Sequence, residues 1–401
     1  MEIEEIVEMD EKHFMNVYSG RYPLYVEKAE GIKIYSKDGK VYRDFLAGIG
    51  VNALGYSNQR FKAALKDQID KIIHCSNLYY IEPQAELEKK LCQNSCYDRV
   101  FFANSGSEAN EGALKLARKY FKKKGTDKFE TITADKSFHG RTMSTVTATG
   151  QDKYKKPFTP LPAGFSTVPF NDLEALKEAV TDKTAVIMLE PVQGEGGIYP
   201  AAQKYLEGVR QLCDEREILL IFDEVQCGMG RTGELFAYQN YGVEADIISL
   251  AKALGGGVPI GAFMATEEVA SAFEPGDHGT TFGGNPLATR AASEVMDIML
   301  EPDFLDSVKE KGGYFRAELD QLVAENDNLV ETRGLGLMLA LELADGLSAK
   351  EITSQLFERG FLVNAVKETT LRFLPPLVVE KEDMNLLVKN IKEIINSERV
   401  G

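Results

Sequence analysis

The middle of the chain contains short, nearly continuous apolar runs, separated by segments whose apolar positions recur at helical spacing. The clearest apolar runs cover residues 99–103, 131–134, 185–190, 218–223 and 246–250. Buried strands that alternate with amphipathic helices are typical of a parallel sheet with helices on both faces. Residues 51–290 are therefore predicted to form one large α/β domain.

The two ends of the chain follow a different pattern. Residues 1–50 are predicted to form an arm and a hairpin, since two alternating segments, 32–35 and 41–45, flank a polar turn. Residues 291–401 begin with a long helical pattern and then mix strands and helices, ending in a helix near 381–397. Because both ends flank the central sheet, we expect them to form a smaller α+β domain together.

The composition of the 401-residue chain suits a globular enzyme, with 44% hydrophobic and 27% charged residues. Its net charge of −16 disfavours nucleic acids and anionic membranes as partners, because both bind surfaces rich in Lys and Arg. No apolar stretch reaches the roughly 20 residues that cross a bilayer. The acidic N-terminus lacks the basic start of a signal peptide. We therefore expect a cytoplasmic location.

The five cysteines are irregularly spaced. Cys92 and Cys96 lie four residues apart, but no second pair occurs that would complete a zinc site. We interpret all five as reduced thiols, as in cytosolic proteins, and we expect no bound metal.

Lys252 and Asp223 are the strongest candidates for chemistry. Lys252 follows an apolar run and precedes three glycines, an arrangement that presents an amine for Schiff-base formation. Asp223, with Glu224 beside it, ends another apolar run, where a buried carboxylate is costly unless it is paired or functional. Beside a pyridine nitrogen, this acid would keep the ring protonated as an electron sink. The two residues suggest a site for pyridoxal 5'-phosphate (PLP).

Two nucleotide-binding interpretations compete with a PLP site. An apolar run ending in Asp-Glu also describes a Walker-B acid, but the chain contains no G-x-x-x-x-G-K-[ST] segment. A dinucleotide fingerprint at Gly194-Glu195-Gly196 fails because Tyr199 stands where the third glycine belongs. Both interpretations are disfavoured.

Three further segments carry weaker signals. Residues 104–111 read NSGSEANE at a predicted strand-to-helix turn, where backbone N–H groups can hold a phosphate, although a capped helix that binds nothing has the same pattern. Phe138 and Arg141 follow another strand and suit ring stacking and carboxylate binding, but each alone also suits packing or a surface charge. The polar loop at 278–286 offers hydroxyl groups, or is simply a turn.

Eight motifs occur in one order between residues 104 and 377: NSGSEANE, SFHGRT, EPVQGEGG, FDEVQCGMGRTG, LAKALGGGVPIGA, HGTTFGGNP, RGLGLM and LRFLPPL. In this order they resemble the ornithine and acetylornithine branch of the class III, fold-type I, PLP-dependent aminotransferases, and the resemblance covers the chain from about residue 22 to residue 377. The resemblance implies a large α/β domain with a mixed, mostly parallel sheet, and a smaller α+β domain built from the N- and C-terminal segments.

The resemblance also implies how PLP is held. Lys252 is expected to form a Schiff base with it and later to move the proton between substrate and cofactor, while Asp223 pairs with the pyridine nitrogen. The other expected cofactor-binding residues are Gly106 and Ser107 at the phosphate, Phe138 and Val225 on the two ring faces, Gln226 at the phenolic oxygen, Glu224 beside Asp223, and Thr281, which reaches the phosphate in the site of a neighbouring subunit. A homodimer with shared active sites follows from the last of these roles.

Four substrate-binding residues are implied as well. Arg141 is expected to bind the α-carboxylate of acetylornithine, and Arg372 that of glutamate or 2-oxoglutarate. Glu195 is expected to pair with Arg372 when no carboxylate is present, because an unpaired buried guanidinium is costly. Thr280 is expected beside the substrate.

The expected reaction is transamination of N2-acetyl-L-ornithine with 2-oxoglutarate, giving N-acetyl-L-glutamate 5-semialdehyde and L-glutamate, a step of arginine biosynthesis. The alternatives are ornithine, succinylornithine, succinyl-diaminopimelate or 4-aminobutyrate as amino donor, an aminomutase, and a binding protein that has lost catalysis. His139 stands where ornithine δ-aminotransferases usually carry tryptophan, which favours an acylated substrate.

Overall fold

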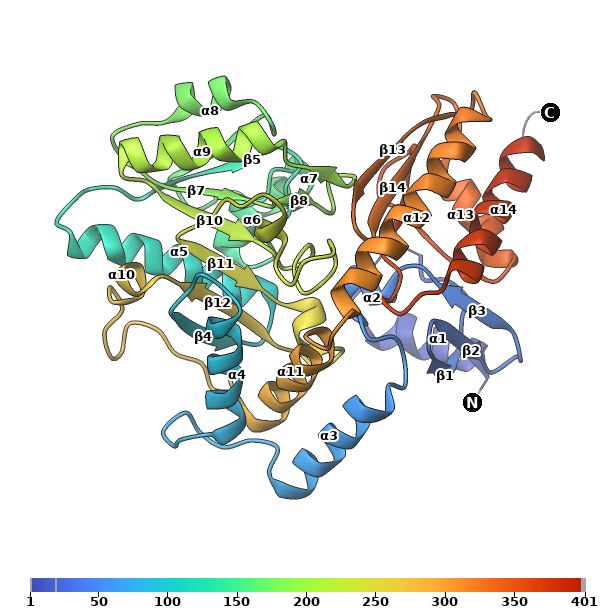
Figure 1. Cartoon of the computed structure of the whole chain (residues 1–401), viewed down its shortest axis with the longest axis horizontal. Helices are drawn as coiled ribbons and strands as arrows, with labels where there is room; N and C mark the ends of the chain where they lie inside the picture. The colour runs from blue at the N-terminus through green and yellow to red at the C-terminus, as the bar shows by residue number, and fades with distance from the viewer. Residues whose placement is uncertain (1, 19, 398–401) are drawn as a thin grey trace.

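A sheet of seven strands forms the centre of the larger lobe in the computed structural model, which describes residues 2–18 and 20–397 (Figure 1). In spatial order the strands are β4 (Arg99–Ala103), β12 (Gly261–Ala265), β11 (Ile247–Leu250), β10 (Leu219–Asp223), β7 (Thr184–Leu189), β5 (Glu130–Ala134) and β6 (Phe165–Val168). Among these strands, only β12 runs in the direction opposite to the other six. The mixed, mostly parallel sheet is confirmed.

The apolar runs predicted to be strands coincide with β4, β5, β7, β10 and β11 to within one residue at each end. The sequence pattern did not indicate β6 or β12. The residues of β12 are mostly small, Gly-Ala-Phe-Met-Ala, and they follow a glycine-rich segment, so their apolar pattern is weak. All five are nevertheless buried.

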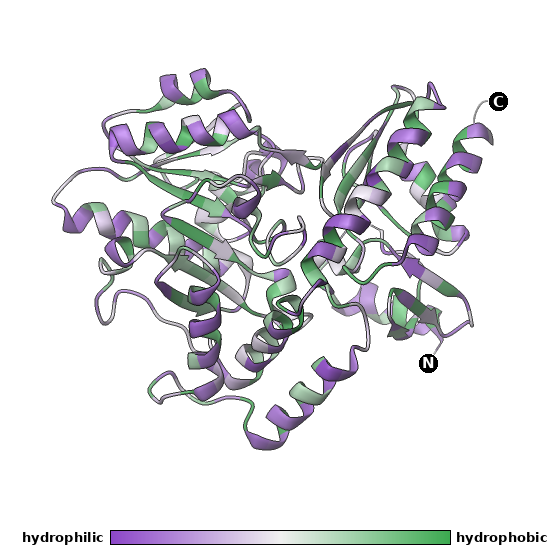
Figure 2. Ribbon diagram, in the orientation of Figure 1, coloured by the Kyte–Doolittle hydropathy of each residue, from purple (hydrophilic) through white to green (hydrophobic). Residues whose placement is uncertain are grey.

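Both faces of the sheet are covered by helices. Leu219 and Ile221 of β10 belong to the apolar cluster under α5 (Gly106–Lys123), whereas Leu220 and Phe222 belong to the cluster that includes α9 (Gln203–Arg216). Successive side chains of a strand point to opposite faces, so a strand between two helical layers is apolar at every position. Figure 2 shows this as hydrophobic strands between helices that are hydrophilic on their outer sides.

The smaller lobe combines the two ends of the chain (Figure 1). Its main sheet is antiparallel and contains β13 (Leu329–Leu335), β14 (Met338–Leu343), β17 (Thr370–Phe373) and β16 (Asn364–Ala365), with α12 (Phe304–Ala324), α13 (Ala349–Glu358) and α14 (Lys381–Ser397) beside it. Its second sheet contains β1 (Val26–Glu30), β2 (Lys33–Ser36), β3 (Val41–Asp44) and β15 (Phe361–Leu362). Because β15 pairs with β3, the expected joining of the two ends is confirmed.

The helix α11 (Pro286–Met299) runs across the expected domain boundary at residue 290 and packs against α3 (Gln59–Lys71) and α4 (Glu82–Gln93). The remaining short elements are α1 (Ile3–His13), α2 (Ala47–Gly50), α6 (Met143–Ala148), α7 (Asp152–Lys155), η1 (Lys156–Phe158), α8 (Leu173–Ala179), β8 (Val192–Gln193), β9 (Tyr199–Pro200), η2 (Ala237–Asn240), η3 (Lys252–Gly255) and α10 (Glu267–Ala270). Within the described ranges, no helix combines the length and the apolar character needed to cross a membrane.

Candidate functional site

A cavity of about 380 Å³ lies at the carboxyl ends of the parallel strands, where ligands bind in open α/β sheets. Its volume falls in the range of roughly 300–1,000 Å³ that is typical of small-molecule sites. The predicted site residues that line it are Gly106, Ser107, Phe138, Glu195, Asp223, Val225, Gln226 and Lys252. These residues come from five separate segments of the chain, so the fold brings together most of what the motifs indicated.

Lys252 follows β11 and begins η3. Its backbone is in the left-handed region, with φ of 47°, which is uncommon for a residue with a side chain and is often found at functional sites. Burial lowers the pKa of the amine, and the negative charges of Glu195 and Asp223 only partly offset this effect. Lys252 therefore loses its proton more readily than an exposed lysine does.

Asp223 is held by three hydrogen bonds and is only 3% exposed. Its Oδ2 accepts from His139 Nδ1 and from Asn110 Nδ2, each at 2.8 Å, and its Oδ1 accepts from the backbone N–H of Val225 at 3.0 Å. Burial disfavours the imidazolium form of His139, but Asp223 outweighs burial, so the pKa of His139 is raised. The cavity thus contains a fixed, negatively charged acid at the end of β10.

The N-terminus of α5 forms another wall of the cavity. The side chain of Ser105 caps the helix by accepting a hydrogen bond from the backbone N–H of Glu108 at 3.2 Å. A Cβ atom on Gly106 would lie 2.7 Å from the Val225 side chain, so a larger residue does not fit there. The first N–H groups of this 18-residue helix therefore lie at the cavity, where they favour an anion.

Arg372 lies behind the cavity wall and is 1% exposed. Its Nη1 donates to Glu195 Oε1 at 2.5 Å, and its Nη2 donates to Asn364 Oδ1 at 2.8 Å. Burial alone would raise the pKa of Glu195, but the charge and hydrogen bond of Arg372 outweigh it, so this pKa is lowered. Glu195 is therefore an ionised counter-ion for a buried guanidinium.

Glu224 does not line the cavity, although its neighbour Asp223 does. Its carboxyl group accepts from the backbone N–H of Ala237 at 2.5 Å and from that of Tyr238 at 2.7 Å. Successive side chains at the end of a strand point in opposite directions, which explains why only one of the two acids faces the cavity. Burial raises the pKa of Glu224 to about 8.

Arg141, Thr280 and Thr281 also lie outside the lining of this cavity. Arg141 is exposed; its backbone N–H donates to Ser107 Oγ at 3.1 Å, and its guanidinium lies 4.1 Å from the ring centroid of Tyr154. The hydroxyl of Thr280 accepts from the N–H of Gly283 at 3.0 Å, and Thr281 is exposed.

Three residues that line the cavity lie within the quoted motifs, but the sequence analysis gave them no role at the cofactor: Asn110, His139 and Glu190. Asn110 is four residues after Gly106 and thus on the same face of α5. Glu190 follows an apolar strand just as Asp223 ends one, so the same signal was available. Its carboxyl oxygens accept from the N–H groups of Phe138 at 3.1 Å and Gly194 at 3.2 Å. Burial raises the pKa of Glu190 to about 7. No local pattern indicates that His139 contacts Asp223.

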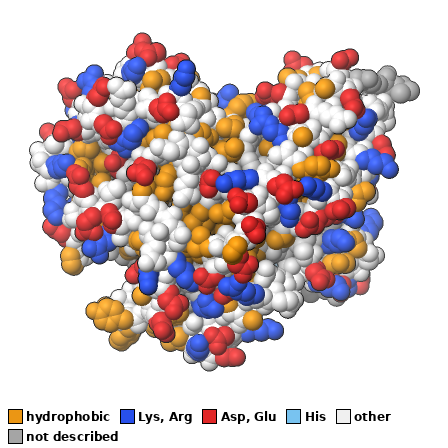
Figure 3. Space-filling view, in the orientation of Figure 1, with side chains coloured by type: hydrophobic (Ala, Val, Ile, Leu, Met, Phe, Trp, Pro, Cys, Tyr) orange, Lys and Arg blue, Asp and Glu red, His pale blue; other side chains and the backbone are white. Residues whose placement is uncertain are grey.

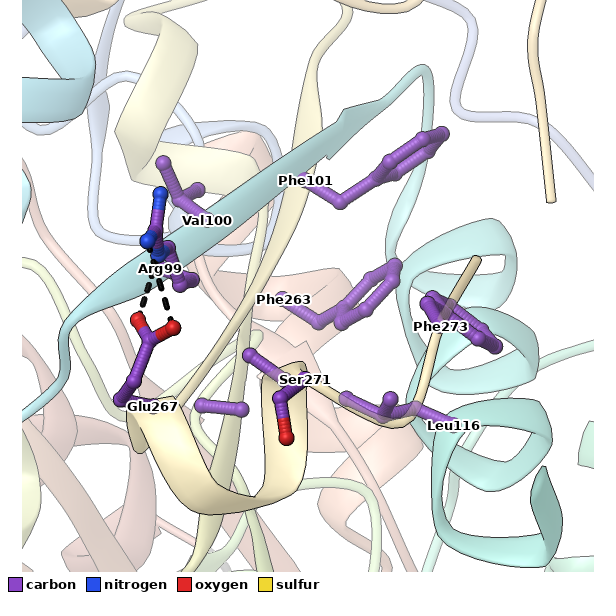
Figure 4. A pocket seen from close by; sticks show the side chains of 10 residues that line it. Arg99, Val100, Phe101, Leu116, Phe263, Glu267, Ser271 and Phe273 are labelled. Carbon is purple, nitrogen blue, oxygen red and sulfur yellow. Dashed lines mark hydrogen bonds and ion pairs between the residues drawn. The ribbon is translucent and has the colours of Figure 1, made fainter. Parts of the chain in front are cut away.

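A second cavity, of about 310 Å³, lies between β4, β12, α5 and α10 (Figure 4). Phe101, Phe263 and Phe273 form much of its wall. Arg99 and Glu267 at its edge pair with each other, with Nε and Oε2 2.6 Å apart. A mostly apolar cavity whose charged residues are already paired offers no chemistry comparable with that around Lys252.

Comparisons with known proteins agree with this geometry. The family model for class-III aminotransferases matches residues 14–395. The chain is 52% identical to an acetylornithine aminotransferase of Methanocaldococcus jannaschii, over 98% of each protein. It is 48% identical to an acetylornithine aminotransferase of Caldanaerobacter subterraneus, over 98% of this chain and 100% of that protein.

Solved structures are similar as well. The ornithine aminotransferase of Toxoplasma gondii matches with a TM-score of 0.95 at 31% identity, covering 100% of this chain and 96% of that one. The acetylornithine aminotransferase of Elizabethkingia anophelis matches with a TM-score of 0.88 at 31% identity, covering 99% of this chain and 100% of that one.

Proposed function

Because the chain belongs to the class-III aminotransferases, which depend on PLP, we propose that it transfers the terminal amino group of N2-acetyl-L-ornithine to 2-oxoglutarate. The products are N-acetyl-L-glutamate 5-semialdehyde and L-glutamate, and the step belongs to arginine biosynthesis. Relatives that are 44–52% identical over nearly the whole chain carry the name of this activity, which supports the choice of substrate.

The residues at the cavity around Lys252 fit PLP. Gly106 lines the cavity at the start of α5, where the helix N–H groups are suited to the phosphate. The buried carboxylate of Asp223 suits a protonated pyridine nitrogen, and the amine of Lys252 suits the aldehyde. When bound, PLP supplies an electron sink for the carbanion formed at the substrate carbon.

The chain itself supplies proton transfer and orientation. The lowered pKa of Lys252 suits a general base that takes a proton from the substrate carbon and then delivers this proton to the cofactor. His139 and Asn110 fix Asp223, so that its charge stays beside the ring nitrogen. Phe138 and Val225 provide apolar surfaces for the two faces of the ring.

The observation that carries the proposal is the ion pair between Arg372 and Glu195. Acetylornithine reacts through its terminal amine and glutamate through its α-amine, so one pocket must accept a neutral methylene in one half-reaction and a carboxylate in the other. Arg372 binds the α-carboxylate of glutamate in one half-reaction. When acetylornithine is bound, the carboxylate of Glu195 pairs with Arg372 instead. Glu195 lies between Gly194 and the pair Gly196-Gly197, a segment that allows the side chain to move.

Arg141 is proposed to bind the α-carboxylate of acetylornithine. Its guanidinium stacks on Tyr154 and has no carboxylate within ion-pair distance among residues 2–18 and 20–397. A stacked guanidinium keeps its N–H edges available for bidentate binding. The hydrogen bond from the backbone N–H of Arg141 to the hydroxyl of Ser107 holds Arg141 next to the proposed phosphate site.

The active form is proposed to be a homodimer in which Thr281 reaches the phosphate of the other subunit and Thr280 lies beside the substrate. An exposed apolar surface supports this assembly, because Leu78 is 86% exposed, Tyr79 68% and Phe282 61%. Asn77 donates to the backbone oxygens of Thr280 and Gly283, so this surface is continuous with the loop that carries Thr281. The five free cysteines suit the cytoplasmic location that we propose.

The test is a panel of amino donors with 2-oxoglutarate as acceptor, using PLP-loaded protein. We expect kcat/KM for acetylornithine to exceed that for free ornithine by about tenfold or more, since a site built for the acyl group loses its contacts with that group when ornithine binds and meets a charged α-amine instead. A higher value for ornithine or 4-aminobutyrate would overturn the proposed substrate. Turnover without any acceptor would indicate an aminomutase.

A further inference from the structure

Lys136 and Lys367 lie over the same aromatic ring. Their Nζ atoms are 5.4 Å and 4.9 Å from the ring centroid of Tyr199. Arg333 lies over the same ring at 4.3 Å, but it is paired with Glu331 and Glu342. For the two lysines, no carboxylate lies within ion-pair distance in the part of the chain that the structure describes.

These two lysines lie beside the segment that follows Glu195. A Cβ atom on Gly196 would lie 2.8 Å from the backbone oxygen of Lys136, and one on Gly197 would lie 3.3 Å from Lys367 Cε. Both glycines directly follow Glu195, which lines the cavity. Lys136 through its backbone, and Lys367 through its side chain, therefore lie next to the segment that is proposed to move when Glu195 releases Arg372.

The surroundings compensate these positive charges only in part. Burial lowers the pKa of Lys367, the charges of Lys136 and Arg333 lower it further, and the negative charge of Glu342 offsets only part of this effect. Lys153 adds another positive charge nearby. Like charges held together without ion-pair partners destabilise a fold. The chain has a net charge of −16 and is therefore rich in carboxylates, yet none of them forms an ion pair with these two lysines among the described residues. Such an arrangement at the rim of a pocket is typical of a site that binds an anion.

We propose that Lys136 and Lys367 form a capture site for carboxylates at the rim of the cavity, where glutamate and 2-oxoglutarate bind before they reach Arg372. The inference rests on the proposed function for the identity of the ligand, a dicarboxylic acid with a chain of five carbons. The lysines act through diffusion and local concentration of the anion and take no part in the chemical step. Figure 3 shows the hollow between the two lobes, flanked by basic and acidic side chains on one face of the molecule.

The first test measures the glutamate half-reaction of the PLP-loaded double variant Lys136→Gln/Lys367→Gln. Glutamine keeps most of the side chain over Tyr199 and removes the charge. We expect kcat/KM for glutamate to fall about tenfold at low ionic strength, with kcat unchanged, because steering raises the rate of encounter. In about 1 M salt, where the Debye length is about 3 Å, the difference from the wild type should disappear.

The matched control is Lys122→Gln/Lys183→Gln. Lys122 lies at the carboxyl end of α5 and Lys183 precedes β7, so both are at the edge of the sheet opposite the cavity. The control changes the net charge by the same amount, and it should retain the wild-type kcat/KM at every salt concentration. An equal loss in both double variants would mean that net charge alone is responsible and would overturn the capture site.

The second test does not depend on turnover. Glutarate, a five-carbon dicarboxylate without an amino or keto group, is titrated calorimetrically into the holoenzyme at low ionic strength. Its affinity should fall about fivefold or more in Lys136→Gln/Lys367→Gln and stay unchanged in the control. Unchanged glutarate binding in both would overturn the inference. Should acetylornithine prove not to be a substrate, the proposed function fails, while this titration still tests the capture site.

Discussion

Arg372 Nη1 and Glu195 Oε1 are 2.5 Å apart, and this ion pair joins a buried strand of the smaller lobe to a glycine-flanked segment of the larger lobe. Glu195→Gln removes the counter-ion but keeps the shape of the side chain. We expect kcat/KM for acetylornithine to fall about tenfold or more, because truncating one member of a buried charge pair costs about 2–5 kcal/mol. The glutamate half-reaction should be nearly unchanged, since glutamate brings its own carboxylate.

Single-turnover measurements of the two half-reactions separate these effects. Equal losses in both halves would show that Glu195 maintains the site as a whole and does not alternate with a substrate carboxylate. Asn364→Ala, which removes a neutral partner of Arg372, serves as a comparison because it leaves the charge of Glu195 in place.

Lys252→Ala is expected to lower kcat by about a thousandfold or more, since the general base and the amine for Schiff-base formation are both lost. The visible absorbance of the lysine-linked cofactor should disappear as well. Absorption spectra of purified variant, combined with steady-state kinetics, check both outcomes. A variant that retains the spectrum and the turnover would disprove the assignment of Lys252.

Arg141→Ala should impair the acetylornithine half-reaction by about tenfold or more, because a bidentate carboxylate contact is lost, and should spare the glutamate half-reaction. Stopped-flow spectra give the rate of each half-reaction, and the ratio of the variant rate to the wild-type rate is compared between the two halves. Tyr154→Phe is a matched control, because it retains the ring that supports the guanidinium. An equal effect of Arg141→Ala on both halves contradicts the proposed division between Arg141 and Arg372.

Glu224 makes the stability depend on pH. Its pKa is raised by burial to about 8 in the folded protein, so the unfolded chain releases this proton near its ordinary pKa of about 4.3 while the folded chain keeps it. Raising the pH from about 5 to 8 therefore favours unfolding through this group, by an amount on the order of a few kcal/mol. Denaturant unfolding at both pH values measures the free energy of unfolding, which should decrease less between about pH 5 and pH 8 in Glu224→Gln than in the wild type. An equal decrease in both proteins would contradict the assignment of this pH dependence to Glu224.

Much of the fold follows from local patterns. The strands around Asp223 and Lys252 are apolar at most positions, because helices cover both faces of the sheet, and such runs are easily recognised. The sequence did not indicate β12 for two reasons. Its pairing with β4 and β11 forms only in the folded protein, and its mostly small residues give a weak apolar pattern.

The site could be predicted wherever a side chain ends a strand or begins a helix, as with Asp223, Gly106 and Ser107. Contacts between segments could not be predicted in the same way. The hydrogen bonds of Asp223 with His139 and Asn110 arise only when three segments meet. Glu224 was expected at the site because it is next to Asp223 in the chain. Its side chain instead points to the other side of the strand, where it accepts a hydrogen bond from the backbone N–H of Ala237.

The pairing of Phe361 with Arg43 in adjacent strands has a consequence for biosynthesis of the protein. On the ribosome, the hairpin of β1, β2 and β3 emerges early but has no fourth strand until nearly all of the polypeptide has been made. The larger lobe is complete in sequence well before that moment and can fold first. Premature termination before β15 should thus leave the amino-terminal hairpin exposed to proteases, while the central sheet resists them.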